Sequence, residues 1–177
     1  MDQKRQKRQL ILDTNIIQYG TDKKYSDALL EVLESLRSKY EFAASSISKY
    51  EYFAGMSGKK SKKKIQEGVS FFRALAMIPI NDDHLKIAAA LTTSYKCNDA
   101  SRSFECGVSF SDKLIGATAI SLGACVLTGN SNDFLSPFFD EADIFTLKPS
   151  TEREQKISIV IPNIKMFNNE VKSIYKI

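Results

Sequence analysis

The sequence predicts an α/β fold in which a mainly parallel sheet lies between two layers of helices. Short apolar runs of about four residues, the length of a buried strand, alternate with longer segments whose apolar residues recur at helical spacing. Serines and glycines, which favour helix ends, stand at the borders of these segments. Parallel strands need a crossover connection that is usually a helix, so this alternation is typical of a parallel sheet covered on both faces.

The first third of the chain predicts two strands, each followed by a helix. In chain order these elements are a strand at 9–12, a helix at 27–37, a strand at 41–44 and a helix from Ser46 to Ala54. Ser45 or Ser46 is suited to cap the second helix, and Gly55 to end it.

The following segments continue the alternation. In chain order they are a helix at 65–76, a strand at 77–80, a helix at 82–95, an irregular segment at 97–110, a helix at 112–122 and a strand at 124–128. Ser111 is the predicted cap of the last helix and Gly123 its end. The single histidine, His84, falls on the polar side of its predicted helix.

Composition indicates one main domain in a reducing compartment. The 177 residues are 43% hydrophobic, which is enough for a substantial core. The chain contains no uncharged apolar run of about 18 residues, and its basic start leads into only a short apolar segment. Cys97, Cys106 and Cys125 lack the paired spacing of a zinc site and suit reduced thiols. We therefore expect a cytoplasmic protein without a membrane span or a secretory signal.

Positive charge is unevenly distributed, although the net charge is only +4. Four basic residues crowd the N-terminus, and the stretch KKSKKK contributes Lys59, Lys60, Lys62, Lys63 and Lys64. Such runs attract phosphates, so this stretch predicts either an RNA contact or a solvated loop that keeps the chain soluble.

Four acidic residues are expected to converge on one pocket. Asp13 follows the first strand, in LILDTNII, and Asp133 lies in the loop after the strand 124–128. Ligands of parallel sheets gather outside these carboxyl ends. Asp112 opens a helix, and Glu51 lies at the edge of the buried face of another. Taken singly, each acid could instead be a structural cap or a solvated charge.

The charge repulsion between clustered carboxylates must be offset. Two such charges about 5 Å apart repel by about 3 kcal/mol at an effective dielectric of about 20. Either one group shares a proton or divalent cations bind, and carboxylate oxygens favour Mg²⁺ or Mn²⁺ over zinc. The chain has a single histidine and no nucleophile motif, so its sequence does not favour a Ser-His-Asp mechanism.

These motifs together resemble those of the PIN-domain nucleases. LILDTNII is similar to their opening strand and Asp-Thr-Asn motif, SSISKYEYFAG to their Glu-bearing second motif, and FSDKLIGATAISLGACVLTGNSNDF to their third and fourth acidic motifs. The order and spacing fit, and the pattern is nearest to the VapC-type toxins of toxin-antitoxin pairs. The resemblance implies a PIN-like three-layer α/β/α fold and a magnesium-dependent endoribonuclease that a partner antitoxin inhibits.

The resemblance also implies site residues. The acids that match the catalytic metal site, with Mg²⁺ or Mn²⁺ bound, are Asp13, Glu51, Asp112 and Asp133. The polar residues that match its surroundings are Thr14, Asn15, Thr128 and Asn130. A bound metal would lower the pKa of the water that attacks the RNA phosphodiester. Asn15 would orient Asp13 or the backbone of the turn. The sequence leaves open whether Asp133 or Asn130 faces the metal.

Three parts of the chain follow from this comparison: a basic arm at 1–8, a PIN-like nuclease domain at 9–147 and a C-terminal extension at 148–177. The extension holds KISIVIPNI and the amphipathic MFNNEVKSIYKI. It would add an edge strand and a covering helix to the domain, or form part of a subunit or antitoxin contact. We expect RNA as the substrate, an antitoxin as a partner and a homodimer as the assembly.

Two other classes of protein fit part of this pattern. A phosphatase of the haloacid dehalogenase type also has an Asp after its first strand, but it needs a second Asp two residues later, where this chain has Asn15. A PIN fold that only binds RNA or protein, without catalysis, is the remaining alternative, although all four acids are present.

Overall fold

The structure is a computed structural model, in which residues 7–56, 61–97, 108–149 and 153–175 are described. These residues form one six-stranded sheet with the strand order β3-β2-β1-β4-β6-β5. The strands are β1 Arg8–Leu12, β2 Tyr40–Ser45, β3 Ala76–Ile78, β4 Cys125–Thr128, β5 Phe139–Leu147 and β6 Gln155–Pro162. Strands β1 to β4 pair in parallel, whereas β6 runs antiparallel to β4 and to β5. The predicted mainly parallel sheet is confirmed.

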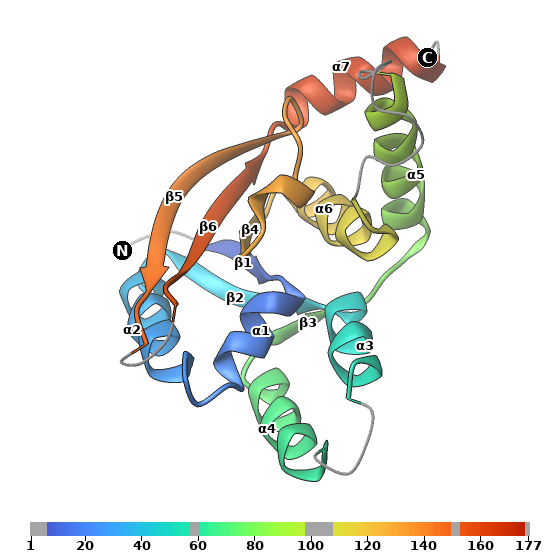
Figure 1. Cartoon of the computed structure of the whole chain (residues 1–177). Coiled ribbons are helices and arrows are strands. Elements are labelled where there is room, and N and C mark those ends of the chain that lie inside the picture. The colour runs from blue at the N-terminus through green and yellow to red at the C-terminus, as the bar shows by residue number, and fades with distance from the viewer. Residues whose placement is uncertain (1–6, 57–60, 98–107, 150–152, 176–177) are drawn as a thin grey trace, which may run out of the picture.

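Helices cover both faces of this sheet. They are α1 Thr14–Gly20, α2 Ser26–Leu36, α3 Ser46–Ala54, α4 Ser61–Arg73, α5 Asp82–Cys97, α6 Phe110–Leu122 and α7 Ile164–Tyr175. Figure 1 shows α5, α6 and α7 on one side of the sheet and α1, α2 and α4 on the other. The predicted three-layer α/β/α arrangement is therefore confirmed.

Alternation along the central strands creates two cores. Successive side chains of a strand point to opposite faces. Leu10 and Leu12 of β1 pack in the core beneath α1, α2 and α4, whereas Ile11 packs in the core beneath α5 and α6. Strand β4 repeats the pattern, with Val126 on the α6 side and Leu127 on the α1 side. Both faces of these strands are buried, so polar groups gather only where the strands end.

The predicted helices and strands between residues 9 and 128 are present, with ends shifted by a few residues. Most of the irregular segment predicted at 97–110 lies outside the described residues. Helix α1 was not predicted, because seven residues are too few to show helical spacing. Helix α4 begins at Ser61, so the lysines at 62–64 lie in its first turn and not in a loop, which corrects the sequence interpretation. Lys59 and Lys60 lie outside the described residues.

Two predicted details are wrong. Ser109, not Ser111, caps α6, and its hydroxyl accepts a hydrogen bond from the backbone N–H of Asp112. His84 is not on a polar helix side but is 2% exposed. Its Nδ1 accepts from the backbone N–H of Asn81 at 3.3 Å, and Asn81 Oδ1 in turn accepts from the His84 N–H at 3.0 Å. This exchange satisfies groups at the start of α5, which explains the burial of a polar ring.

The residues beyond 148 add a strand and a helix to the fold. Strand β6 lies between β4 and β5, so the expected edge strand is wrong, and β5 forms the edge of the sheet. Helix α7 packs against α5, and its Phe167 is buried in the α5–α6 core. Cys125 has a free, buried thiol. Of the helices in the described part of the chain, none has the length and apolar character needed to span a bilayer.

Candidate active site

Asp13 lies where β1 ends and α1 begins. It is the N-terminal cap of α1, and its backbone N–H donates to Leu127 O at 3.0 Å, which continues the pairing of β1 with β4. The side chain is 2% exposed. The two parallel strands end side by side, so the next residue of β4, Thr128, is brought to the same place.

Three hydrogen bonds hold the Asp13 carboxylate. Oδ1 accepts from the backbone N–H of Thr14 at 2.5 Å. Oδ2 accepts from Asn15 Nδ2 and from the Thr128 hydroxyl, each at 2.7 Å. A buried carboxylate with donors on both oxygens has a fixed orientation, which is what a metal ligand or a catalytic group requires.

Asn15 and Thr128 also tie the turns after β1 and β4 to each other. The backbone N–H of Gly129 donates to Asn15 Oδ1 at 2.8 Å, and the backbone N–H of Asn130 donates to the Thr128 hydroxyl oxygen at 3.0 Å. Asn15 therefore contacts both the Asp13 carboxylate and the backbone of the neighbouring turn.

Glu51 and Asp112 approach the same place from two helices. The Thr14 hydroxyl donates to Glu51 Oε2 at 2.6 Å, so α3 delivers its carboxylate to the end of β1. Asp112 Oδ2 accepts from the backbone N–H of Ser109 at 3.2 Å and thus completes a capping box. Helices α3 and α6 are in contact, which brings both acids to one side of the sheet.

Asp133 and Asn130 are paired with each other. The side-chain amide of Asn130 donates to Asp133 Oδ2 at 2.9 Å, within the short 3₁₀ turn Ser131–Asp133 after β4. Asp133 is half-buried. The pair lies in the turn that directly follows β4.

The pKa values show that the acids act on one another. Burial raises the pKa of Asp13 to about 7, and the carboxylates of Asp112 and Glu51 add to the rise, whereas the hydrogen bonds from Thr128 and Thr14 oppose it. Burial, followed by the charge of Asp112, raises the pKa of Asp133 to about 6. The charge of Asp112 therefore acts on both Asp13 and Asp133, whereas the charge of Glu51 acts on Asp13. Such shifts are frequent at functional sites.

The donor set suits a hard divalent cation. All its ligand atoms would be carboxylate oxygens, which Mg²⁺ and Mn²⁺ prefer. Within the described residues, Glu51 Oε1 and Asp112 Oδ1 have no hydrogen-bond partner and so keep lone pairs available. In the same part of the chain, no three His, Cys, Asp or Glu side chains lie close enough to form a ready ligand cluster. The acids are instead held by their own hydrogen-bond donors. A bound cation would offset both the cost of burying the Asp13 charge and its repulsion by Asp112 and Glu51.

Two residues of this site escaped the sequence interpretation. Ser109 fixes Asp112 through the capping box, and the spacing Ser-x-x-Asp was a usable signal for it. Gly129 donates its backbone N–H to Asn15. A Cβ on Gly129 would lie 3.1 Å from Tyr19 Cε2, a close approach that no local pattern reveals.

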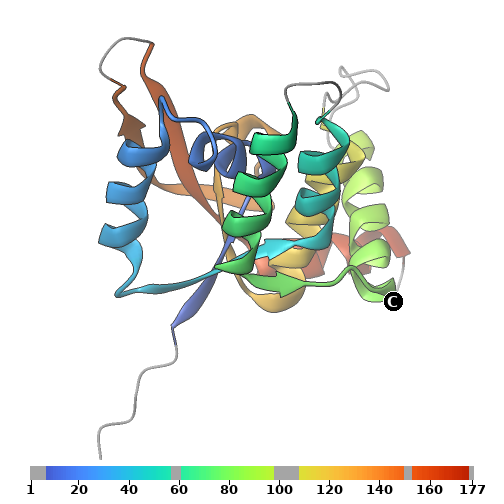
Figure 2. The same ribbon diagram turned by 90° about the horizontal axis from the view of Figure 1, so that it is seen from below.

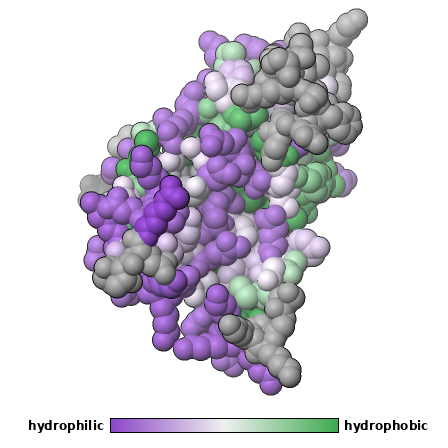
Figure 3. Space-filling model, viewed as in Figure 1, coloured by the Kyte–Doolittle hydropathy of each residue, from purple (hydrophilic) through white to green (hydrophobic). Residues whose placement is uncertain are grey.

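The surface around the site is polar. Figure 3 shows mainly hydrophilic residues over the middle of the face seen in Figure 1, whereas hydrophobic residues gather over α5 and α6. A polar entrance suits a charged substrate better than an apolar one.

Comparison with known proteins agrees with this geometry. The family model described as PIN domain matches residues 10–136. The structure resembles VapBC2 from Rickettsia felis bound to a DNA fragment from their promoter, with 26% identity over 68% of this chain and 87% of that chain and a TM-score of 0.57. FitAcB from Neisseria gonorrhoeae shares the fold, with 22% identity over 71% of this chain and 90% of that chain and a TM-score of 0.56. A toxin-antitoxin complex from Klebsiella pneumoniae also shares it, with 23% identity over 72% of this chain and 92% of that chain and a TM-score of 0.54. Among curated protein sequences there is no match.

Proposed function

The chain belongs to the PIN-domain family, and we propose that it is a divalent-metal-dependent endoribonuclease that serves as the toxin of a toxin-antitoxin pair. One observation carries the enzymatic part. Burial raises the pKa of the Asp13 carboxylate to about 7, and the nearby carboxylates of Asp112 and Glu51 add to the rise. A fold that needed Asp13 only for stability would not bury its carboxylate beside two further acids.

The side chains of this site have separable roles in the proposed reaction. Bound Mg²⁺ or Mn²⁺ would activate a water and neutralise charge on the scissile phosphate. Asp13, Glu51 and Asp112 would hold the cation. Thr128 and Asn15 fix the direction of the Asp13 carboxylate. Thr14 fixes Glu51 through its hydroxyl. With a pKa of about 6, Asp133 is suited to accept a proton from the attacking water near neutral pH.

The basic residues support RNA as the substrate class. Lys62, Lys63 and Lys64 are exposed in the first turn of α4. Helix α4 packs against α3, which carries Glu51. Figure 2 shows α4 beside α3. Phosphates bound by these lysines would lead a strand toward the acids. We include Lys59 and Lys60 of the same run in this proposal.

The proposed partner is an antitoxin protein. One similar structure is a toxin-antitoxin complex from Klebsiella pneumoniae, and the pattern of acidic motifs resembles the VapC-type toxins; both support the same pairing here. We also propose a homodimer that acts on RNA in the cytoplasm. The C-terminal extension, whose β6 and α7 complete the fold, is a further surface for such contacts.

Cleavage of total cellular RNA by the purified protein tests the enzymatic proposal. We expect cleavage with Mg²⁺ or Mn²⁺, none with a chelator, and none by Asp13→Asn or Asp112→Asn. Asp82→Asn, at an exposed position on α5, is the matched control and should cut like wild type. If wild type binds RNA but never cuts it with either metal, the protein is a binding module with a PIN fold.

A further inference from the structure

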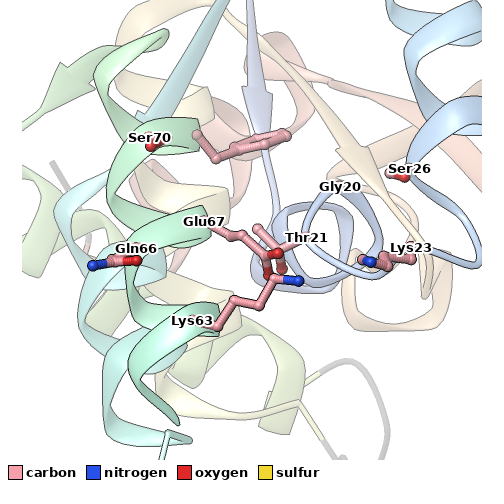
Figure 4. Close-up of a pocket in the computed structure, with 9 residues that line it drawn as sticks. Gly20, Thr21, Lys23, Ser26, Lys63, Gln66, Glu67 and Ser70 are labelled. Carbon is pink, nitrogen blue, oxygen red and sulfur yellow. The ribbon is translucent and has the colours of Figure 1, made fainter.

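A cavity of about 500 Å³ lies beside the candidate active site, between the end of α1 and helix α4 (Figure 4). Its volume is typical of small-ligand sites. Helix α1 begins at Thr14, next to Asp13, and ends at Gly20, which lines the cavity. At about 1.5 Å per helical residue, the cavity begins about 10 Å from Asp13. A nucleotide near the one cut at Asp13 would reach it.

Gly20 and Phe71 form the inner wall of this cavity. A Cβ at Gly20 would lie 2.3 Å from Phe71 Cε2, so only glycine lets the ring approach α1 this closely. The ring is half-buried and packs on the core beneath α1 and α4. It therefore presents a fixed aromatic surface, of the kind on which unpaired bases stack.

Helix α4, which supplies Phe71 and Glu67 to the cavity, is held in place by α3. A Cβ at Gly68 of α4 would lie 2.2 Å from Tyr52 Cε1, and the Tyr52 hydroxyl donates to Lys64 O at 3.0 Å. Tyr52 follows Glu51 in the sequence. The cavity wall and one of the proposed metal ligands are thus fixed to the same helix.

Charged groups line the rim. Figure 4 shows Lys63 and Glu67 reaching from α4 toward Thr21 at the end of α1, with Lys23 on the far side. Among the described residues, no ion pair joins Lys23 or Lys63 to a carboxylate. An aromatic wall, a carboxylate acceptor and two ammonium groups together match the base and the phosphates of a nucleotide.

We propose that this cavity is a subsite for one guanine nucleotide of the RNA, an inference that rests on the proposed ribonuclease function. The base stacks on Phe71, and Lys63 and Lys23 contact the flanking phosphates. The Glu67 carboxylate accepts from the Watson–Crick edge of the base. Guanine presents two adjacent N–H groups there, which one carboxylate can accept together, whereas uracil presents one. The cavity thus selects a guanine close to the cut.

Binding of short RNA in a chelator tests the subsite without cleavage. The probes are an oligouridylate with one central guanosine and the same strand with inosine, which lacks the 2-amino group. We expect wild type to bind the guanosine strand about tenfold more tightly by fluorescence anisotropy. Glu67→Gln should lose this preference, and Phe71→Leu should bind both strands about tenfold more weakly. Glu31→Gln, exposed on α2, is the control and should match wild type.

Two outcomes separate this subsite from the proposed catalysis. If Glu67→Gln keeps the preference for guanosine, the subsite is overturned, whatever the RNA cleavage assay shows. Should Phe71→Leu melt far below wild type, the result for Glu67→Gln alone decides the test. If the preference depends on Glu67 but wild type cuts no RNA with Mg²⁺ or Mn²⁺, the subsite stands and the nuclease function falls. If wild type does cut RNA, cut-site mapping should place a guanosine at one fixed offset from the cut in wild type and not in Glu67→Gln.

Discussion

The hydroxyl of Thr128 lies 2.7 Å from Oδ2 of Asp13 and donates a hydrogen bond to it, across the boundary between β4 and β1. This bond favours the ionised carboxylate in a place where burial, Asp112 and Glu51 all disfavour it. Thr128 therefore sets how much of Asp13 is ionised near neutral pH, and with it how readily the site can take a cation.

Replacing Thr128 by valine should make the site harder to ionise. Thr128→Val removes the donor at nearly constant shape, so the pKa of Asp13 rises further above its ordinary value. The acidic limb of the cleavage–pH profile should move to higher pH, and Mg²⁺ affinity should fall about 10- to 100-fold. Thr118→Val, whose buried hydroxyl donates only to Leu114 O, is the control. Identical pH profiles for Thr128→Val and wild type would contradict this role.

Asp13 should make the stability of the metal-free protein depend on pH. Its pKa of about 7 in the folded chain exceeds its ordinary value of 3.8, so the folded state holds the proton more tightly. The contribution to stability is fully present below about pH 4 and is lost as the pH rises through about 7. The loss is on the order of a few kcal/mol.

Denaturant unfolding in a chelator measures this effect. Between about pH 5 and about pH 8, wild type should lose stability relative to Asp13→Asn, which has no group to titrate. Using the difference between two proteins cancels the other titrating groups. Asp82→Asn should track wild type. If the difference in unfolding free energy between wild type and Asp13→Asn stays constant over this range, the Asp13 carboxylate is already ionised in the folded protein.

Divalent cations should restore the stability that is lost at high pH. At about 100 times its dissociation constant, a ligand stabilises by about 2.7 kcal/mol, which for a chain of this size raises Tm by roughly 5–10 °C. The rise should be larger at pH 8 than at pH 6, because protons compete for the ligands. Asp13→Asn and Asp112→Asn should lose it, and Asp82→Asn should keep it. An equal rise in all four proteins would place the cation elsewhere.

Local pattern predicted most of the fold, because the central strands are buried on both faces and their helices carry long apolar stripes. It failed where the deciding contact is distant in sequence. Strand β6 lies beside β4 because Val126, Leu127 and Thr128 pair with it, and no pattern in KISIVIPNI shows which neighbour it will take. His84 was misplaced because its burial depends on an exchange with Asn81, not on helical spacing.

The features of the site likewise fall into those that local sequence predicts and those that depend on distant residues. Asp13 could be placed from sequence because it directly follows a strand, where parallel sheets gather ligands. The raised pKa of Asp13 could not be, since it arises first from burial in the folded chain, and Asp112 and Glu51 on two other helices add to it. The pocket wall at Phe71 was equally hidden, because only the absence of a side chain at Gly20 allows that contact.

The lysine run should govern RNA affinity and not the chemistry. Replacing Lys59, Lys60, Lys62, Lys63 and Lys64 by glutamine should weaken RNA binding and flatten its salt dependence by about 0.7 in slope for each lost phosphate contact. The cleavage rate on saturating RNA should change much less than the affinity. The matched control replaces Lys39, Lys86 and Lys165, which lie on other elements. If the five-lysine variant keeps the RNA affinity and salt slope of wild type, these lysines are a solvated surface and do not contact RNA.

Gly68 should be needed for both the stability of α4 and the position of Glu51. In Gly68→Ala the new Cβ would lie 2.2 Å from Tyr52 Cε1 and 2.8 Å from Cζ. The ring is 1% exposed and its hydroxyl is bound to Lys64 O, so it has little room to move. Overpacking of this kind costs about 1–3 kcal/mol, and Tm should fall by about 2–4 °C for each kcal/mol.

Gly55→Ala is the matched control for this prediction. Its new Cβ would meet nothing closer than Glu51 O at 3.4 Å, and Gly55 has a φ of −71°, which alanine adopts without strain. It should therefore melt near wild type. A shift of Tyr52 moves Glu51, its neighbour in the sequence, away from the Thr14 hydroxyl, so the rise in Tm on adding Mg²⁺ should shrink in Gly68→Ala and stay intact in Gly55→Ala. If Gly68→Ala lowers Tm but leaves the metal-induced rise unchanged, the packing of α4 is independent of the metal site, and α3 alone positions Glu51.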